Sequence, residues 1–205
     1  MDTENIQPKK RGLNLPNTLS LIRVVLVPVF LACALYLDGV PLWGRLVPML
    51  IFALASLTDM LDGKIARKYN LITDFGKFLD PLADKFMVFG ALLAILFIEQ
   101  DPMVKNVFVW VAALVIFREL AITSLRMVIA GSSGKVLAAS FWGKAKTCTQ
   151  IAAILVVLAD PLFASVPVLQ TRVLSYVFLG LMAVATLFSG IDYARAYLPL
   201  IDTNR

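Results

Sequence analysis

Four aspartates lie close together in an otherwise apolar part of the chain. They are Asp59, Asp62, Asp80 and Asp84. Residues three or four positions apart lie on one face of a helix. Asp59 and Asp62 would therefore share a face of one helix, and Asp80 and Asp84 would share a face of the next. Four carboxylates can share a low-dielectric site only if divalent cations neutralise them. Because Asp oxygens suit Mg²⁺ or Mn²⁺, the spacing predicts a two-metal site of the kind that supports in-line attack at phosphorus.

Glycine, alanine and arginine recur around these aspartates at fixed spacing. The chain reads D-x-x-D-G-x-x-A-R from Asp59 to Arg67 and, after eight intervening residues, G-x-x-x-D-x-x-x-D from Gly76 to Asp84. A glycine lets a helix backbone approach a nucleotide closely, and a guanidinium can bind two phosphate oxygens at once. The competing interpretation is structural, with glycines that pack helices and an arginine that marks the cytoplasmic side.

A basic group lies later in the chain. Its members are Arg118, Arg126, Lys135, Lys144 and Lys146. An arginine well inside a membrane span needs an internal partner or a water-filled cavity, and a phosphorylated substrate would provide that partner. Two alternatives stay open. Arg118 could pair with an acid such as Glu119, and the lysines could form a patch against anionic lipid.

The elements that position these residues are membrane spans. The chain has 205 residues, of which 60% are hydrophobic, and its mean hydropathy is +0.83, far from a soluble average. Six stretches are long enough to cross a bilayer as helices, namely 19–37, 46–68, 78–98, 107–129, 144–159 and 172–195. Since lipid excludes unpaired backbone groups and no barrel alternation is present, we predict an all-α polytopic membrane protein with six transmembrane helices.

The basic residues favour one orientation of these spans. With the N-terminus inside, Arg45, Lys105 and Arg172 fall outside and the other basic residues fall inside, so we predict cytoplasmic N- and C-termini. The N-terminal residues lack the pattern of a signal peptide, and a bacterial cytoplasmic membrane is the simplest location. The net charge of +5 then reflects topology and an anionic phospholipid bilayer. No nucleic-acid partner is predicted, because no aromatic-interleaved basic groove is present.

We predict one helical domain over residues 17–198. It follows an N-terminal interfacial or flexible segment, 1–16, and precedes a C-terminal tail, 199–205. A short loop from Tyr69 to Gly76 joins the two aspartate-bearing helices and makes them antiparallel neighbours. Their aspartates would therefore meet on the cytoplasmic side.

Loop and cap residues set the remaining boundaries. Asn17 can cap the first span, and a second inner loop is expected from Gly131 to Gly143. Outer turns are expected at Asp38, at 99–102 and at Asp160.

The aspartate motif closely resembles the signature of the CDP-alcohol phosphotransferase family, integral membrane enzymes that make phospholipids from CDP-activated donors. Every signature position is matched. Before the motif, the resemblance extends to Pro16-Asn17, Ser20 and Arg23. After it, the stretch most resembles the phosphatidylglycerophosphate synthase branch through Arg118-Glu119-Leu120, Arg126, Lys135, Ser140, Gly143-Lys144, Lys146-Thr147 and Gln150.

The resemblance implies a homodimeric enzyme that transfers phosphatidyl from CDP-diacylglycerol to glycerol 3-phosphate with two Mg²⁺ (or Mn²⁺) ions. Asp59, Asp62 and Asp80 would hold one ion, and Asp59, Asp80 and Asp84 the second. The residues expected around the nucleotide are Asn17, Ser20, Gly63, Ala66, Arg67, Thr73 and Gly76. Those expected to bind the acceptor are Arg118, Arg126, Lys135 and Lys144.

Asp84 is the expected general base. The chain contains no histidine, so the carboxylates must accept any proton. A sister enzyme that uses inositol phosphate, phosphatidylglycerol or serine as acceptor is the nearest alternative. A divalent-cation transporter is an alternative of another class, although the spacing of Gly63, Arg67 and Gly76 would have no role in it.

Overall fold

The computed structural model describes residues 15–68, 74–133, 141–163 and 171–197. Within these ranges the chain is helical, apart from short turns, and contains no strand. The helices are α1 (Leu15–Tyr36), α2 (Trp43–Lys68), α3 (Asp74–Ile98), α4 (Pro102–Ser133), α5 (Phe141–Ala159), the short 3-10 helix η1 (Asp160–Phe163) and α6 (Val173–Tyr197). The predicted all-α class is confirmed.

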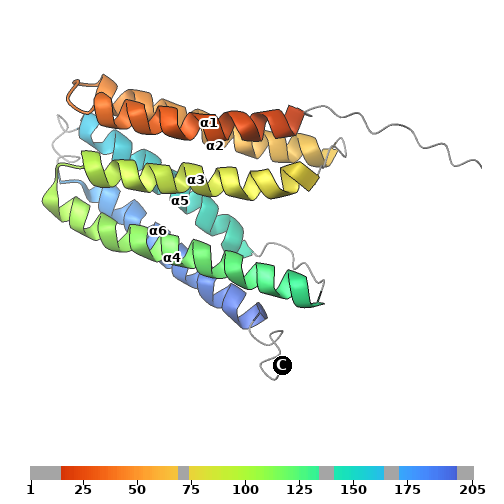
Figure 1. The fold of residues 1–205 in the computed structure, drawn as a ribbon. Coiled ribbons are helices and arrows are strands. Elements are labelled where there is room, and N and C mark those ends of the chain that lie inside the picture. Colours follow the sequence, from red (N-terminus) through yellow and green to blue (C-terminus); the bar gives the residue numbers. More distant parts are fainter. Residues whose placement is uncertain (1–14, 69–73, 134–140, 164–170, 198–205) are drawn as a thin grey trace, which may run out of the picture.

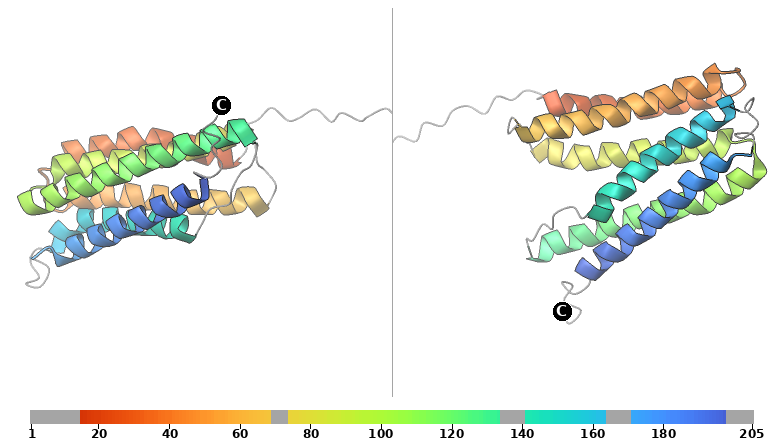
Figure 2. Two further views of the ribbon diagram at one scale, coloured as in Figure 1. Left: turned by 90° about the horizontal axis from the view of Figure 1, so that it is seen from below. Right: turned by 180° about the vertical axis from the view of Figure 1, so that it is seen from behind.

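The α-helices alternate in direction along one bundle (Figure 1). α1 packs against α2 and α3, while α6 packs against α4 and α5. α5 also contacts α2 and so joins the two groups, which splay apart toward one end of the bundle (Figure 2). We call that end, where α2 stops and α3 starts, the motif end, and the opposite end the far end.

Small residues allow α3 to pack closely on α1. Ala83, Ala91 and Ala94 of α3 are fully buried. Gly90 lies on the same helix, and a Cβ added there would meet Val27 Cγ1 of α1 at 3.1 Å. Close backbone approach through small side chains is the usual way in which membrane helices gain packing contacts. The helix that carries Asp80 and Asp84 is therefore held firmly against α1.

Five helices are long and apolar enough to cross a membrane. The stretches are Thr18–Tyr36, Trp43–Met60, Pro102–Met127, Phe141–Phe163 and Val173–Ala196. In α3, the described residues supply a shorter apolar stretch, Lys85–Ile98. Large apolar side chains such as Trp110 and Phe117 point outward, 74% and 79% exposed, as a lipid-facing surface requires. The sixth span and the orientation of the termini stay predictions.

The expected outer turns all lie at the far end. At the start of α2, just after the first of these turns, a Cβ on Gly44 would lie 2.2 Å from the carbonyl oxygen of Leu37, so only glycine fits there. In the next turn, Asp101 Oδ1 accepts hydrogen bonds from the backbone N–H groups of Met103 at 2.9 Å and Val104 at 3.1 Å. This side chain caps α4, and the proline at the start of α4 needs no hydrogen bond.

Buried ion pairs join these turns. Arg172 Nη2 lies 3.1 Å from Glu99 Oε1, and Arg172 Nη1 lies 3.9 Å from Asp160 Oδ2. Ser175 also donates a hydrogen bond to Asp160. In the first turn, Arg45 donates to the carbonyl oxygen of Ile98 and lies 3.8 Å from Asp38. The far end is thus closed by charges that are matched within the protein.

Helix boundaries at the motif end differ from the sequence-based expectation. α1 begins at Leu15, so Asn17 lies in its first turn and does not cap it. Pro16 fits that turn because its missing N–H would have no helical partner there. α3 begins at Asp74, a residue suited to a helix start, so Gly76 lies in the helix and not in the loop. The second inner loop is also shorter than expected, because α4 and α5 both extend into it.

Candidate active site

The chain reversal between α2 and α3 brings the aspartate-bearing segments to one end of the bundle (Figure 1). Asp59 and Asp62 lie in the C-terminal half of α2, and Asp80 and Asp84 lie in the N-terminal half of α3. Of the four side chains, the structure describes that of Asp59. The convergence of all four carboxylates stays a prediction.

The Asp59 carboxylate is held by an arginine from α1. Arg23 Nη1 lies 2.8 Å from Asp59 Oδ1. The Arg23 side chain is 2% exposed, whereas that of Asp59 is 39% exposed. The pair therefore reaches from the interior of the bundle to an accessible carboxylate. Sequence reasoning gave Arg23 no role, although a charged residue inside an apolar span was a signal that could have singled it out.

Ser20 lies on the same face of α1 as Arg23, three residues earlier. It is 1% exposed. Its hydroxyl therefore belongs to the bundle interior at the motif end and not to the lipid-facing surface. A contact with a nucleotide would require the ligand to enter between the helices.

The other expected nucleotide contacts also lie near the motif end. The helix backbones place Asn17 in α1, Gly63, Ala66 and Arg67 in α2, and Gly76 in α3. The orientation of their side chains lies outside what the structure describes, and Thr73 lies outside the described residues altogether. These roles stay predictions.

Glu119 of α4 is the centre of the second charged group. Its Oε1 accepts hydrogen bonds from Arg118 Nη1 at 3.1 Å and from Lys146 Nζ of α5. Arg118 Nη2 donates to Ser189 Oγ of α6 at 2.5 Å, and its guanidinium carbon lies 5.3 Å from the ring centroid of Tyr193. The pairing of Arg118 with Glu119, which the sequence left open, is present in the structure. Acceptor binding by Arg118 stays a prediction, and it would have to coexist with these contacts.

The remaining basic residues differ in exposure. Lys146, which was not among the expected acceptor ligands, is 7% exposed and is bound to Glu119. Arg126 and Lys144 are exposed near the motif end. Lys135 lies outside the described residues. Within this basic group, Arg126 and Lys144 are therefore the described members best placed to meet a ligand from solution.

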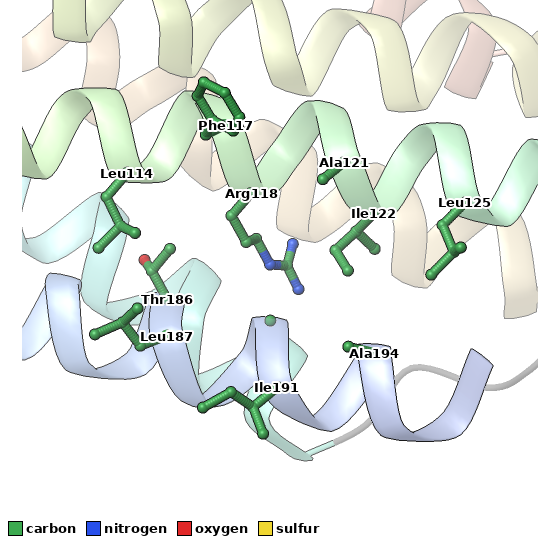
Figure 3. Close-up of a pocket in the computed structure, with 11 residues that line it drawn as sticks. Leu114, Phe117, Arg118, Ala121, Ile122, Leu125, Thr186, Leu187, Ile191 and Ala194 are labelled. Carbon is green, nitrogen blue, oxygen red and sulfur yellow. The ribbon is translucent and has the colours of Figure 1, made fainter. Parts of the chain in front are cut away.

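A cavity of about 440 Å³ lies between α4 and α6. Figure 3 shows Arg118 pointing into it from α4, between apolar side chains. These include Leu114, Ile122 and Leu125 of α4 and Leu187, Ile191 and Ala194 of α6. A mostly apolar lining with one cationic group suits a hydrocarbon chain near an anionic head group.

The donor set at the motif end fits a divalent cation. Carboxylate oxygens are the ligands that Mg²⁺ and Mn²⁺ prefer, and the partly exposed Asp59 has a second oxygen beside the one that faces Arg23. The described side chains by themselves contain no group of three His, Cys, Asp or Glu residues that could hold a metal ion. A metal site there depends on the carboxylates of Asp62, Asp80 and Asp84.

Known proteins resemble this chain along most of its length. The family model for CDP-alcohol phosphatidyltransferase matches residues 13–190. The CDP-diacylglycerol–glycerol-3-phosphate 3-phosphatidyltransferase of Bacillus subtilis is 42% identical over 153 residues, which cover 69% of this chain and 74% of that protein. The probable phosphatidylglycerophosphate synthase of Mycobacterium tuberculosis is 38% identical over 200 residues, 95% of this chain and 87% of that protein. A protein of Pseudomonas fluorescens with the same name as the Bacillus protein is 35% identical over 195 residues, 94% of each chain.

Proposed function

Because this chain belongs to the CDP-alcohol phosphatidyltransferase family, we propose that it transfers a phosphatidyl group from CDP-diacylglycerol to glycerol 3-phosphate. The observation that carries this function is the similarity to relatives named for that reaction over 94–95% of the chain. Their names favour glycerol 3-phosphate over inositol phosphate, phosphatidylglycerol or serine as the acceptor. A cation transporter has no comparable support.

The reaction replaces a phosphoanhydride bond by a phosphate ester bond. A hydroxyl oxygen of glycerol 3-phosphate attacks the phosphorus atom that bears the diacylglycerol group. The bond from that phosphorus to the bridging oxygen of the pyrophosphate breaks, and CMP leaves with the oxygen. Asp84 accepts the hydroxyl proton, since the chain has no histidine to do so. The products are phosphatidylglycerophosphate and CMP.

The four aspartates would be the ligands of two divalent cations, Mg²⁺ or Mn²⁺. Asp59, Asp62 and Asp80 would hold one ion, and Asp59, Asp80 and Asp84 would hold the other. When bound, such ions neutralise negative charge on the pyrophosphate and on the oxygens that enter and leave. The carboxylate oxygens of the four aspartates, and the position of their helix segments at one end of the bundle, support this assignment.

Donor and acceptor are held by different groups. Arg67 binds the pyrophosphate of the donor. The cytidine is surrounded by Asn17, Ser20, Gly63, Ala66, Thr73 and Gly76. Arg118, Arg126, Lys135 and Lys144 bind the phosphate of the acceptor. The acyl chains lie along apolar grooves between helices, of which the cavity between α4 and α6 is one.

The enzyme works as a homodimer in the bacterial cytoplasmic membrane, with its active site toward the cytoplasm. Five apolar helices of spanning length and the bacterial relatives support a multi-pass location in that membrane. The distribution of basic residues supports the orientation.

An assay of acceptor choice tests this function. Purified full-length protein is incubated with CDP-diacylglycerol, Mg²⁺ and one of glycerol 3-phosphate, inositol phosphate, serine or phosphatidylglycerol. Release of CMP and formation of phosphatidylglycerophosphate are expected with glycerol 3-phosphate, and neither is expected in EDTA. CMP release with another acceptor alone would assign the chain to a sister activity. Cation flux into proteoliposomes without CMP release would indicate a transporter.

A further inference from the structure

Arg23 is an unusual residue for its helix. α1 contains no other Asp, Glu, Lys or Arg along Leu15–Tyr36. The Arg23 side chain is 2% exposed and is directed at the neighbouring α2, where Nη1 meets Asp59 Oδ1 at 2.8 Å. A buried guanidinium is unfavourable unless it is paired, so the contact with Asp59 offsets part of the cost of burying Arg23.

The partner of Arg23 has a different environment. Asp59 is 39% exposed, although it belongs to the same ion pair. One of its two oxygens faces the arginine, so the other can serve a ligand that arrives from the accessible side. A carboxylate fixed on one oxygen loses rotational freedom and keeps its second oxygen in a defined direction.

A second arginine, which is nearly buried, forms an ion pair with a structural role only. At the far end, Arg45 donates to the carbonyl oxygen of Ile98 at the end of α3 and lies 3.8 Å from Asp38. Its side chain is 11% exposed and that of Asp38 is 28% exposed. Arg45 joins the first turn to α3 and lies at the opposite end of the bundle from the aspartate motif. It provides a natural comparison for Arg23.

We propose that Arg23, paired with Oδ1 of Asp59, is the positive counter-charge of the aspartate cluster while no cation is bound. This inference rests on the proposed role of Asp59 as a metal ligand. In the proposed site the four carboxylates are neighbours and repel one another while no cation is bound, and a fixed guanidinium lowers that repulsion. When the cation binds, it takes over the neutralisation, and the same guanidinium then opposes it.

Two consequences separate this role from simple packing. Loss of the Arg23 charge destabilises the metal-free protein more than the metal-bound protein, because the cation can replace the counter-charge. The same loss strengthens cation binding, because a like charge near the cation has been removed. A residue that only packs α1 against α2 would lower stability equally in both conditions and would leave cation affinity unchanged.

The test uses full-length protein in detergent, with Mn²⁺ alone as the probe. Mn²⁺ affinity is measured by electron paramagnetic resonance of the free ion, and thermal unfolding is followed in EDTA and in saturating Mn²⁺. Arg23→Gln is expected to lower the unfolding temperature by about 5 °C in EDTA. That deficit is expected to shrink by about half or more in Mn²⁺, while Mn²⁺ affinity rises about tenfold. Arg23→Lys, which keeps the charge, should recover most of the stability in EDTA.

A double-mutant cycle shows whether Arg23 acts through Asp59. In an Asp59→Asn background, Arg23→Gln should cause a smaller loss in EDTA than it does in the parent, because the two side chains are coupled. Arg45→Gln is the matched control. It should lower the unfolding temperature by the same amount with and without Mn²⁺ and leave Mn²⁺ affinity unchanged.

The inference is overturned if Arg23→Gln behaves like Arg45→Gln, or if its effects add to those of Asp59→Asn. Should Arg23→Gln fail to fold in EDTA, it is expected to fold when Mn²⁺ is present from purification onward, and failure in both conditions, while Arg23→Lys folds in both, would also overturn the inference. Failure of the proposed function looks different, because the parent protein itself would then neither bind Mn²⁺ nor release CMP from CDP-diacylglycerol, and the inference would fall with it.

Discussion

At the far end of the bundle, the side chains of Glu99 and Asp160 are 0% and 1% exposed and both face Arg172. At the motif end, Asp59 is 39% exposed beside the buried Arg23. Both ends thus pair acids with buried or nearly buried arginines. They differ in which partner can be reached from outside, since the two acids that face Arg172 are sealed and the motif-end acid is accessible.

The comparison separates ion pairs that stabilise the fold from an ion pair whose acid can also bind a ligand. Sealed acids that already have cationic partners hold turns together, and a ligand cannot reach them. An accessible carboxylate with a fixed orientation can bind a cation. The comparison therefore predicts that changes at the far end affect stability, whereas changes at the motif end affect turnover.

Asp80→Asn should produce the largest effect on turnover. In the proposed site Asp80 would help to hold both ions, so CMP release from CDP-diacylglycerol should fall to background. Without metal, the unfolding temperature should equal or exceed that of the parent, because one of four repelling charges is gone. Thermal unfolding in EDTA and a CMP assay in Mg²⁺ measure the two properties. Substantial Mg²⁺-dependent turnover by a folded Asp80→Asn protein would refute the two-metal assignment.

Asp84→Asn and Arg67→Ala should separate chemistry from donor binding within the motif end. Loss of the general base should reduce kcat by about 100-fold or more and leave much of the donor affinity. Loss of the guanidinium should instead weaken binding of CDP-diacylglycerol. Steady-state kinetics and donor binding measure both. If Asp84→Asn lost donor affinity and Arg67→Ala kept it, the two roles would have to be exchanged.

Arg172→Met should have the largest effect on stability. It removes the cation that both Glu99 and Asp160 face, and an acid left buried without its partner typically costs about 3–5 kcal/mol. The unfolding temperature should drop by about 10 °C, while CMP release per folded molecule stays unchanged. Arg195→Met is the control, because Arg195 is exposed in the last turn of α6 and an exposed charge contributes little. A turnover loss in folded Arg172→Met protein would mean that the two ends are coupled.

The sequence predicted what depends on neighbours along the chain. Apolar runs predicted the all-α class, and turn residues predicted the positions of the far-end turns, because these patterns extend over one helix or one turn. Spacing rules connect residues up to about one turn apart. The start of α3 at Asp74 was missed because turn residues fit a loop as well as a first helical turn.

Pairs between distant helices could not be predicted in this way. Arg23 meets Asp59 across α1 and α2, and Arg118 meets Ser189 although 71 positions separate them. The sequence offered Glu119 as one partner of Arg118, but it could not show that Lys146 shares that acid or that α6 supplies the rest. Such contacts depend on how helices rotate against each other, which the apolar pattern alone leaves undetermined.

Substitutions of the basic residues proposed to bind the acceptor should have a smaller effect, on the KM for glycerol 3-phosphate. Arg126→Ala, Lys144→Ala and Lys135→Ala should each raise the KM for glycerol 3-phosphate by about tenfold and change the KM for CDP-diacylglycerol much less. Arg118→Ala should raise that KM and also lower the unfolding temperature, because it removes contacts to Glu119 and Ser189. Lys105→Ala, in the far-end turn of α4, is the control. If the motif-end variants matched it, the basic group would be a lipid-facing feature.

The smallest effect is expected at Asp101, and it probes the far end without touching an ion pair. Asp101 Oδ1 accepts hydrogen bonds from the first turn of α4, so Asp101→Ala leaves those N–H groups without their cap. The expected loss is about 1 kcal/mol, or an unfolding temperature lower by about 3 °C. Asp101→Asn should lose much less, because an amide oxygen also caps a helix. Kinetic constants for both substrates should be unchanged in both variants. If Asp101→Ala altered a KM and Asp101→Asn did not, the start of α4 would influence Arg118 and Arg126 on the same helix. The far end would then affect turnover as well as stability.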